Sequence, residues 1–213
     1  MKSKLIIFDL DGTLIDSRHD IASAVNHVLV HFDQEPLSVE KIASFVGRGV
    51  RSLLRESLGE GAERHYKRAV KLFRSYYLEH CLDKTELYPN VVAVLESLSD
   101  RKLAIITNKP HMFTEAILEG LRIRDFFGEV VCADQVENKK PAPDAVHVVL
   151  ERARVPCHLS VVVGDSCFDI QMGRAAGIRT CGVTYGYGTE EDLKAEQPDF
   201  LISTIAEAPK VLS

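Results

Sequence analysis

The chain has 213 residues, 46% of them hydrophobic and 27% charged, which is the composition of a globular protein with enough length for a sizeable core. Its 26 Lys and Arg against 31 Asp and Glu give a formal net charge of −5, which argues against general nucleic-acid binding because that function needs a basic surface. The five cysteines form no CxxC pair, and the first apolar run, residues 5–8, is too short for a secretion signal or a membrane span, so we expect a cytoplasmic protein without a membrane partner.

Short runs rich in Ile and Val alternate with helical patterns along most of the chain. Several runs are apolar throughout, which is typical of strands buried on both faces of a parallel sheet. The predicted strands are residues 4–9, 103–107, 129–132, 160–164, 180–184 and 199–202. Helices are predicted between or after them at residues 90–98, 110–121, 141–153, 168–176 and 205–212. This order predicts an α/β protein with a doubly wound parallel sheet.

Residues 15–87 interrupt the alternation because they contain no convincing strand. In the first of their helical patterns, Ile21, Val25 and Val28 form one apolar stripe. The stretch is longer than any ordinary crossover, so we expect an inserted α-helical domain and a discontinuous core of residues 1–14 and 88–213. The helical patterns of the insert cover residues 17–32, 39–45, 49–58 and 63–81.

Acidic side chains follow two of the predicted strands. Asp9 and Asp11 come directly after the first strand, and Gly12 lets the chain turn away from them. Asp165 follows the strand at 160–164, and Asp169 comes one helical turn later. Ligands of open α/β sheets bind outside the carboxyl ends of the strands, so we expect a site there. Two structural interpretations stay open, since Asp-Gly is a common turn and Asp169 is a favourable charge at a helix start.

If Asp9, Asp11 and Asp165 converge, each close pair of carboxylates repels by roughly 4 kcal/mol at an effective dielectric constant of 20. Such a cluster needs a cation or raised pKa values, and a set of oxygen ligands favours Mg²⁺ over zinc. Thr107 ends another strand and Lys140 precedes a proline-rich helix start, so these two side chains could bind an anion. Each also has a structural interpretation, as a helix cap and as a solvated charge.

The motifs DLDGT, ITN, KKPAPD and VGDS begin at Asp9, Ile106, Lys139 and Val163, the second within Ile105-Ile106-Thr107-Asn108. In this order they resemble the four motifs of the haloacid dehalogenase-like (HAD) phosphohydrolases. The resemblance implies a Rossmann-like core and makes the insert, residues 15–87, a mobile helical cap domain. Further segments are similar to the phosphoglycolate phosphatase subgroup of that family, at residues 14–17, 24–26, 46–49 and 181–188.

The resemblance implies a phosphomonoesterase that works through an aspartyl-phosphate. In that family pattern Asp9 is the nucleophile, Asp11 is the general acid and base, and Thr107 and Lys140 hold the transferring oxygens. A carboxylate is a competent nucleophile at phosphorus. The resemblance also implies a Mg²⁺ cofactor, with a metal site formed by Asp9, Asp11, Asp165 and Asp169. Asp11 contributes its backbone carbonyl, and Asp169 is either a ligand or an acid that orients water and Lys140.

Substrate contacts are expected from Thr107, Asn108 and Lys140 of the core and from Gly47 and Arg48 of the insert. Gly47 and Arg48 lie on a glycine-rich turn, where Arg48 could hold a carboxylate bidentately. A solvated arginine is the structural alternative. The loop at 186–188 lacks a phosphate-loop pattern and is expected, by analogy, near the cap.

The second acid, Asp11, separates reaction classes, because haloacid dehalogenases lack an acid there and the insert lysines show no context for phosphonate hydrolysis. The expected partner is a small phosphate ester, with 2-phosphoglycolate the leading candidate. A sugar phosphomutase of the β-phosphoglucomutase type, a pyrophosphatase or nucleotidase, and a binding module without activity are the alternatives. The chain is expected to be a monomer or a homodimer.

Overall fold

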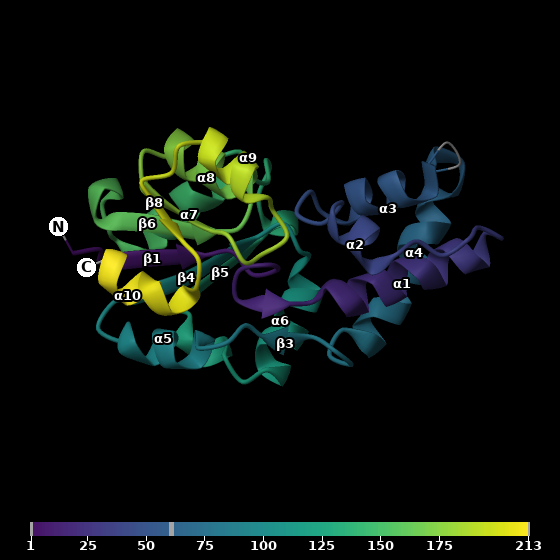
Figure 1. Cartoon of the computed structure of the whole chain (residues 1–213), viewed down its shortest axis with the longest axis horizontal. Coiled ribbons are helices and arrows are strands. Elements are labelled where there is room, and N and C mark those ends of the chain that lie inside the picture. The colour runs from purple at the N-terminus through teal and green to yellow at the C-terminus, as the bar shows by residue number, and fades with distance from the viewer. Residues whose placement is uncertain (1, 60–61, 213) are drawn as a thin grey trace.

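The computed structural model describes residues 2–59 and 62–212. A six-stranded, fully parallel sheet forms the middle layer of the α/β part, on the left in Figure 1, with the strand order β5-β4-β1-β6-β7-β8. This sheet confirms the predicted α/β fold class, and each predicted strand is found with both ends within one residue. The strands are β1 (Leu5–Phe8), β4 (Lys102–Thr107), β5 (Glu129–Cys132), β6 (Ser160–Gly164), β7 (Arg179–Val183) and β8 (Phe200–Ile202).

The first strand, β1, lies between β4 and β6, where Phe8 pairs with Ile105 on one side and Val163 on the other. The sheet grows outward from β1 in both directions, so the strand order reverses there. At such a switch point the carboxyl ends of neighbouring strands leave a crevice for ligands. The Asp9 N–H donates to the Val163 carbonyl at 2.9 Å, which continues the ladder to the first acid after β1.

Both faces of the sheet are covered by helices, which is why the strands are apolar throughout. Ile6 and Phe8 point into one hydrophobic cluster, whereas Leu5 and Ile7 point into the other. Helices α5 (Val91–Ser97), α6 (His111–Gly120) and α10 (Ala208–Val211) cover the first face. Helices α7 (Asp144–Ala153) and α8 (Cys167–Ala175) cover the second. The core is therefore doubly wound, as predicted.

Between β1 and β4 the chain forms a helical region that extends away from one end of the sheet (Figure 1). Its α1 packs against α2, α3 and α4, and α4 also contacts α6 of the core. The stripe predicted for the first helix is buried, including Ile21, Val25 and Val28. The four predicted helices are confirmed with ends within two residues: α1 (Arg18–His31), α2 (Val39–Ala43), α3 (Val50–Leu58) and α4 (Ala62–His80). The domain boundaries at residues 14/15 and 87/88 stay a prediction.

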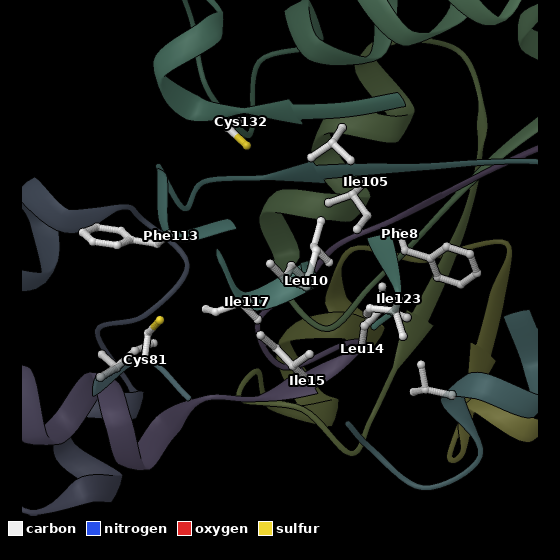
Figure 2. Close-up of a cluster of buried hydrophobic side chains, with 14 of the residues drawn as sticks. Phe8, Leu10, Leu14, Ile15, Cys81, Ile105, Phe113, Ile117, Ile123 and Cys132 are labelled. Atoms are coloured by element: carbon white, nitrogen blue, oxygen red, sulfur yellow. The ribbon is translucent and has the colours of Figure 1, made fainter. Parts of the chain in front are cut away.

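The larger hydrophobic cluster joins this helical region to the sheet. Figure 2 shows Phe8 and Ile105 of the sheet in the same cluster as Ile117 of α6 and Cys81, which follows α4. Because one continuous apolar cluster underlies both parts, the helical region is held against the sheet edge by burial of apolar area.

The expectation that the insert holds no strand is wrong. Strands β2 (Ile15–Asp16) and β3 (Glu86–Leu87) pair antiparallel and form a second, two-stranded sheet at the two ends of the inserted region. Two residues are too few to show an alternating pattern, and the partner strand lies far away in the sequence. No local signal could therefore predict this pairing.

Three helices also differ from the predictions. Helix α10 begins at Ala208 rather than at residue 205, because Ile205–Glu207 form a separate 3-10 helix. Helix α7 begins at Asp144 rather than at residue 141, because Lys140 and Ala142 each precede a proline and such residues are disfavoured in helical geometry. Helix α9 (Glu190–Ala195) was not predicted; the Thr189 hydroxyl caps it by accepting the Asp192 N–H at 3.1 Å. No helix among residues 2–59 and 62–212 is long and apolar enough to cross a membrane.

Candidate active site

Three of the acids that were predicted at strand ends meet at the switch point. Asp9 follows β1, Asp165 follows β6, and Asp169 lies in the first turn of α8. One carboxylate oxygen of each lies within 4.8 Å of the other two, and all three side chains are buried. At this separation three ionised carboxylates repel one another strongly unless positive charge is close.

Lys140 supplies part of that positive charge. Its Nζ lies 2.6 Å from Asp9 Oδ1 and 2.8 Å from Asp169 Oδ1, and its side chain is 3% exposed. Burial lowers the pKa of this ammonium, but the charges of Asp169 and Asp9 outweigh burial and hold the pKa above its ordinary value. Lys140 is therefore a permanently charged group at the centre of the cluster.

Asp165 is held by backbone and hydroxyl donors. Its Oδ2 accepts the N–H of Tyr187 at 2.7 Å and of Gly188 at 3.3 Å, and the Thr13 hydroxyl donates to its Oδ1 at 3.3 Å. Burial, together with the charge of Asp169, raises the pKa of Asp165 to about 6. The loop at 186–188, expected only near the cap, thus also binds an acid of the cluster.

Gly12 makes room for this carboxylate. Its φ of +88° lies in the left-handed region, and a Cβ at this position would lie 2.2 Å from Asp165 Oδ2. The Asp-Gly sequence is therefore more than a turn signal, because only glycine lets Asp165 approach the chain after β1.

Both carboxylate oxygens of Asp169 are already bonded. Lys140 donates to Oδ1, and the N–H and hydroxyl of Ser166 donate to Oδ2 at 3.2 and 2.6 Å. The second pair of bonds is a capping box at the start of α8. Asp169 thus stabilises the helix start and also belongs to the acidic cluster, so the two interpretations of this residue do not compete.

The side chain of Asp11 is bound by a different set of groups. Its Oδ1 lies 2.6 Å from the Nζ of Lys109 and accepts a hydrogen bond from the Ser17 hydroxyl at 2.5 Å. Sequence reasoning identified neither partner. Lys109 directly follows Thr107 and Asn108 at the end of β4, and this position beside a strand end is the signal that could have found it.

The predicted core residues of the substrate site lie together. Thr107 ends β4, and its buried Oγ1 accepts the N–H of Lys109 at 3.1 Å. Asn108 bridges core and insert, since its Oδ1 accepts the Lys140 N–H at 3.1 Å and its Nδ2 donates to the Gly47 carbonyl at 2.7 Å. Gly47 is thereby held at the site.

Arg48 points elsewhere in this structure. Its guanidinium stacks over the ring of Phe168 at 5.4 Å from the centroid, and it is not among the residues that line the cavity. The role predicted for Arg48 stays a prediction.

A cavity of about 50 Å³ lies between these polar groups and the insert. Asp9, Asp11, Thr107, Lys109 and Lys140 are among its polar lining residues. The rest of its wall is largely apolar and comes mainly from the insert and α6, as Ile21, Val46, Val50, Leu53, Phe73, Tyr77, Pro110 and Phe113. A small space with two lysines suits a small anionic ligand.

The acidic cluster fits a divalent cation. Burial raises the pKa of Asp9 well above its ordinary value even though the charge of Lys140 opposes this, and the pKa of Asp165 is raised as well. Burial is the largest cause of both shifts and the neighbouring carboxylates add to it, so these acids are costly to ionise together unless further positive charge is present. Oxygen donors of this kind are the ligands of hard cations such as Mg²⁺.

The pKa of Asp165 predicts how pH acts on the metal-free protein. Because its folded value of about 6 exceeds the ordinary 3.8, the folded state binds this proton more tightly. The resulting stability is complete below pH ~4 and lost as pH rises past ~6, by about 2–3 kcal/mol. Chemical unfolding between these pH values should therefore show a steeper loss for the wild type than for Asp165→Asn.

A cation should reverse this loss, because it binds the ionised oxygens and competes with protons. We expect Mg²⁺ to raise the melting temperature more at about pH 7.5 than at about pH 5. The exposed Asp83→Asn should behave like the wild type. An equal shift at both pH values would contradict a metal site formed by these acids.

Three features together define the class of α/β enzyme to which the chain belongs. They are the doubly wound sheet, the helical region inserted after its first strand, and the cluster of carboxylates and a lysine at the switch point. The sequence model of the haloacid dehalogenase-like hydrolase family matches residues 6–183. The chain belongs to this family, which confirms the resemblance found in its four motifs.

Individual proteins that are similar to this chain indicate a group within the family. Phosphoglycolate phosphatase of Pseudomonas putida is 36% identical over 210 residues, which cover 95% of this chain and 77% of that protein. Phosphoglycolate phosphatase of Escherichia coli O157:H7 is 34% identical over 223 residues, with 94% and 88% covered. The crystal structure of a predicted phosphoglycolate phosphatase from Haemophilus somnus 129pt has a TM-score of 0.94 at 28% identity and covers 100% of this chain and 99% of its own. The chain is similar to the phosphoglycolate phosphatase group within the HAD phosphatases.

Proposed function

We propose that the protein is a Mg²⁺-dependent phosphomonoesterase of small phosphorylated metabolites, with 2-phosphoglycolate as the leading substrate. The observation that carries this proposal is the meeting of Asp9, Asp165 and Lys140 at one sheet edge. A small cavity lies beside them and is lined by Asp9, Lys140, Asp11 and Thr107. The names of the relatives support the choice of substrate.

The metal would be held by the carboxylates of Asp9 and Asp165 and by the backbone carbonyl of Asp11. Asp169 stays a candidate ligand, but its existing bonds favour a role in positioning Lys140. When bound, Mg²⁺ supplies the positive charge that lets a phosphate dianion approach ionised carboxylates.

The chain's own residues would carry the two chemical steps. A carboxylate oxygen of Asp9 attacks phosphorus and forms an aspartyl-phosphate while the bond from phosphorus to the ester oxygen breaks. The leaving alkoxide takes a proton from Asp11. A water then attacks phosphorus, Asp11 takes its proton, and phosphate leaves the regenerated Asp9. Thr107 and Lys140 would donate to the phosphoryl oxygens throughout.

The inserted region, residues 15–87, would act as a cap over this site. Asn108 would set the distance between the phosphate site and the cap, because it bonds to both Lys140 and Gly47. Arg48 would have to leave Phe168 to reach a substrate in the cavity. Its predicted contact with the substrate carboxylate therefore needs a different side-chain position.

The proposal is tested by phosphate release from a panel of esters in Mg²⁺ and in EDTA. We expect 2-phosphoglycolate to exceed glucose 1-phosphate, AMP and pyrophosphate in kcat/KM by roughly tenfold or more. EDTA should abolish turnover and added Mg²⁺ should restore it, because the carboxylate cluster repels a phosphate dianion without a cation.

Each alternative has its own outcome in this panel. Undiminished activity in EDTA would reject the metal, and poor turnover of 2-phosphoglycolate would reject the substrate. Formation of glucose 6-phosphate from glucose 1-phosphate would identify a phosphomutase.

A further inference from the structure

Two side chains that the proposed chemistry does not use line the same cavity. Lys109 follows β4 in the core, and Tyr77 belongs to α4 in the insert. Both are buried, with 8% and 1% of their surface exposed. The Nζ of Lys109 lies 5.0 Å from the centre of the Tyr77 ring, so the two groups are direct neighbours across the boundary between core and insert.

The Tyr77 hydroxyl is buried and has no partner within hydrogen-bond distance in the described part of the chain. Burial, and next the charge of Asp11, raises the pKa of Tyr77, so the phenol keeps its proton. The Ser17 hydroxyl interacts with the phenol and lowers this pKa, but its geometry does not reach that of a hydrogen bond, and its short bond goes to Asp11. Buried hydroxyls are rarely left unpaired in folded proteins. Because Tyr77 is among the residues that line the cavity, a ligand bound there is the acceptor that would satisfy this buried donor.

The Tyr77 ring is also held in a fixed position. It stacks on Phe73 at a centroid distance of 5.3 Å and meets the edge of Phe113 at 5.0 Å. These contacts leave the ring little freedom to turn its hydroxyl toward another acceptor. The donor is thus already oriented before any ligand binds, which lowers the entropic cost of binding.

Lys109 has donors to spare. An ammonium carries three N–H donors, and Lys109 uses one of them for Asp11 Oδ1. Among residues 2–59 and 62–212 the structure records no second acceptor for its Nζ. Lys140, the other lysine of the cavity lining, is already bound to Asp9 and Asp169 at the phosphate end. Lys109 is therefore the cation that can meet a second negative group of a ligand.

We propose that Lys109 and Tyr77 together bind the carboxylate of the substrate and so determine selectivity for phosphorylated carboxylic acids over neutral phosphate esters. A carboxylate accepts hydrogen bonds only, and these two cavity-lining residues offer one charged and one neutral donor. Most of the remaining wall is apolar and gives a carboxylate no other charged partner. This inference rests on the proposed phosphatase activity and specifies its substrate class.

The test compares 2-phosphoglycolate with 2-hydroxyethyl phosphate, a neutral-ended ester of similar size. We expect Tyr77→Phe to lower the ratio of their kcat/KM values by roughly 5- to 10-fold, and Lys109→Met by roughly 50-fold or more. Tyr77→Phe should keep the wild-type melting temperature, because the hydroxyl forms no bond in the fold. Lys67→Met, an exposed lysine on the same helix α4, should leave the ratio unchanged.

Calorimetry separates this inference from the proposed function, because binding to an Asp9→Asn background needs no turnover. In that background Lys109→Met and Tyr77→Phe should weaken the binding of 2-phosphoglycolate by the same factors. The binding of 2-hydroxyethyl phosphate should stay unchanged. If the wild type hydrolyses neither ester, the proposed function fails, and these binding constants still decide the inference.

Two results would overturn the inference. An equal loss for both esters with an unchanged ratio would show that the pair only positions Asp11. If Arg48→Ala lowers the ratio of the two kcat/KM values and Tyr77→Phe does not, Arg48 and not Tyr77 binds the substrate carboxylate. If Lys109→Met does not fold, the kcat/KM ratio of Tyr77→Phe still decides whether the inference holds.

Discussion

The Asp9→Asn variant should release phosphate from 2-phosphoglycolate at least about 10⁴-fold more slowly than the wild type. An amide has nearly the same size as a carboxylate but does not attack phosphorus. The fold should keep most of its stability, because burial raises the pKa of Asp9 and Lys140 keeps Asp169 as its second partner in the variant. Phosphate release and thermal unfolding, measured on the same preparation, check both parts.

Asp83→Asn is the matched control for this substitution, since Asp83 is exposed and lies away from the acidic cluster. It should keep the wild-type rate. Mass spectrometry of the quenched wild-type reaction should find a phosphoryl group on the peptide that contains Asp9. A substantial rate in Asp9→Asn with an unchanged melting temperature would mean that another residue is the nucleophile.

Lys140→Met should abolish turnover as fully and also destabilise the fold, unlike Asp9→Asn. Removal of the buried ammonium leaves Asp9 and Asp169 without their cation, and breaking a buried ion pair from one side costs about 3–5 kcal/mol. Without Lys140 the acids hold their protons to higher pH in the folded state, so stability should recover as pH falls. Added Mg²⁺ should restore part of the lost free energy of unfolding at neutral pH.

Urea unfolding at about pH 5 and pH 7.5, with and without Mg²⁺, measures this pattern. Lys194→Met is the control, because its exposed ion pair with Glu190 contributes about 0.5 kcal/mol or less. A Lys140→Met protein as stable as the wild type at neutral pH would show that the cluster does not need the lysine charge.

The two acids at the strand ends could be predicted because their positions depend on strand identity alone. Asp9 and Asp165 directly follow strands that are buried on both faces, and the carboxyl ends of parallel strands meet at one edge. Such strands are visible as unbroken apolar runs, which is why their ends were located to within one residue. By contrast, β2 and β3 carry too few residues for any periodic pattern.

Asp11 shows where this kind of prediction stops. Its position after β1 identified it as part of the site, but nothing in its neighbourhood predicted a bond to Lys109 or to Ser17. Tyr77 lies in helix α4 and was not singled out by any sequence pattern. Its unpaired hydroxyl becomes visible only when α4 is placed against α6 and the core.

Fold class, strand limits and the identity of the acids follow from local patterns, because burial on two faces and chain order impose them residue by residue. Which groups share a proton, a cation or a ligand depends on distances of a few ångströms between segments far apart in the chain. The partners of Asp165 on the 186–188 loop, the contact of Asn108 with Gly47 and the meeting of Lys109 with Tyr77 are all of this kind. They arise from the packing of the helical insert and the loops onto the sheet edge. Electrostatic interactions depend on the distance between the charged and polar groups, and the number of residues between two segments does not determine that distance.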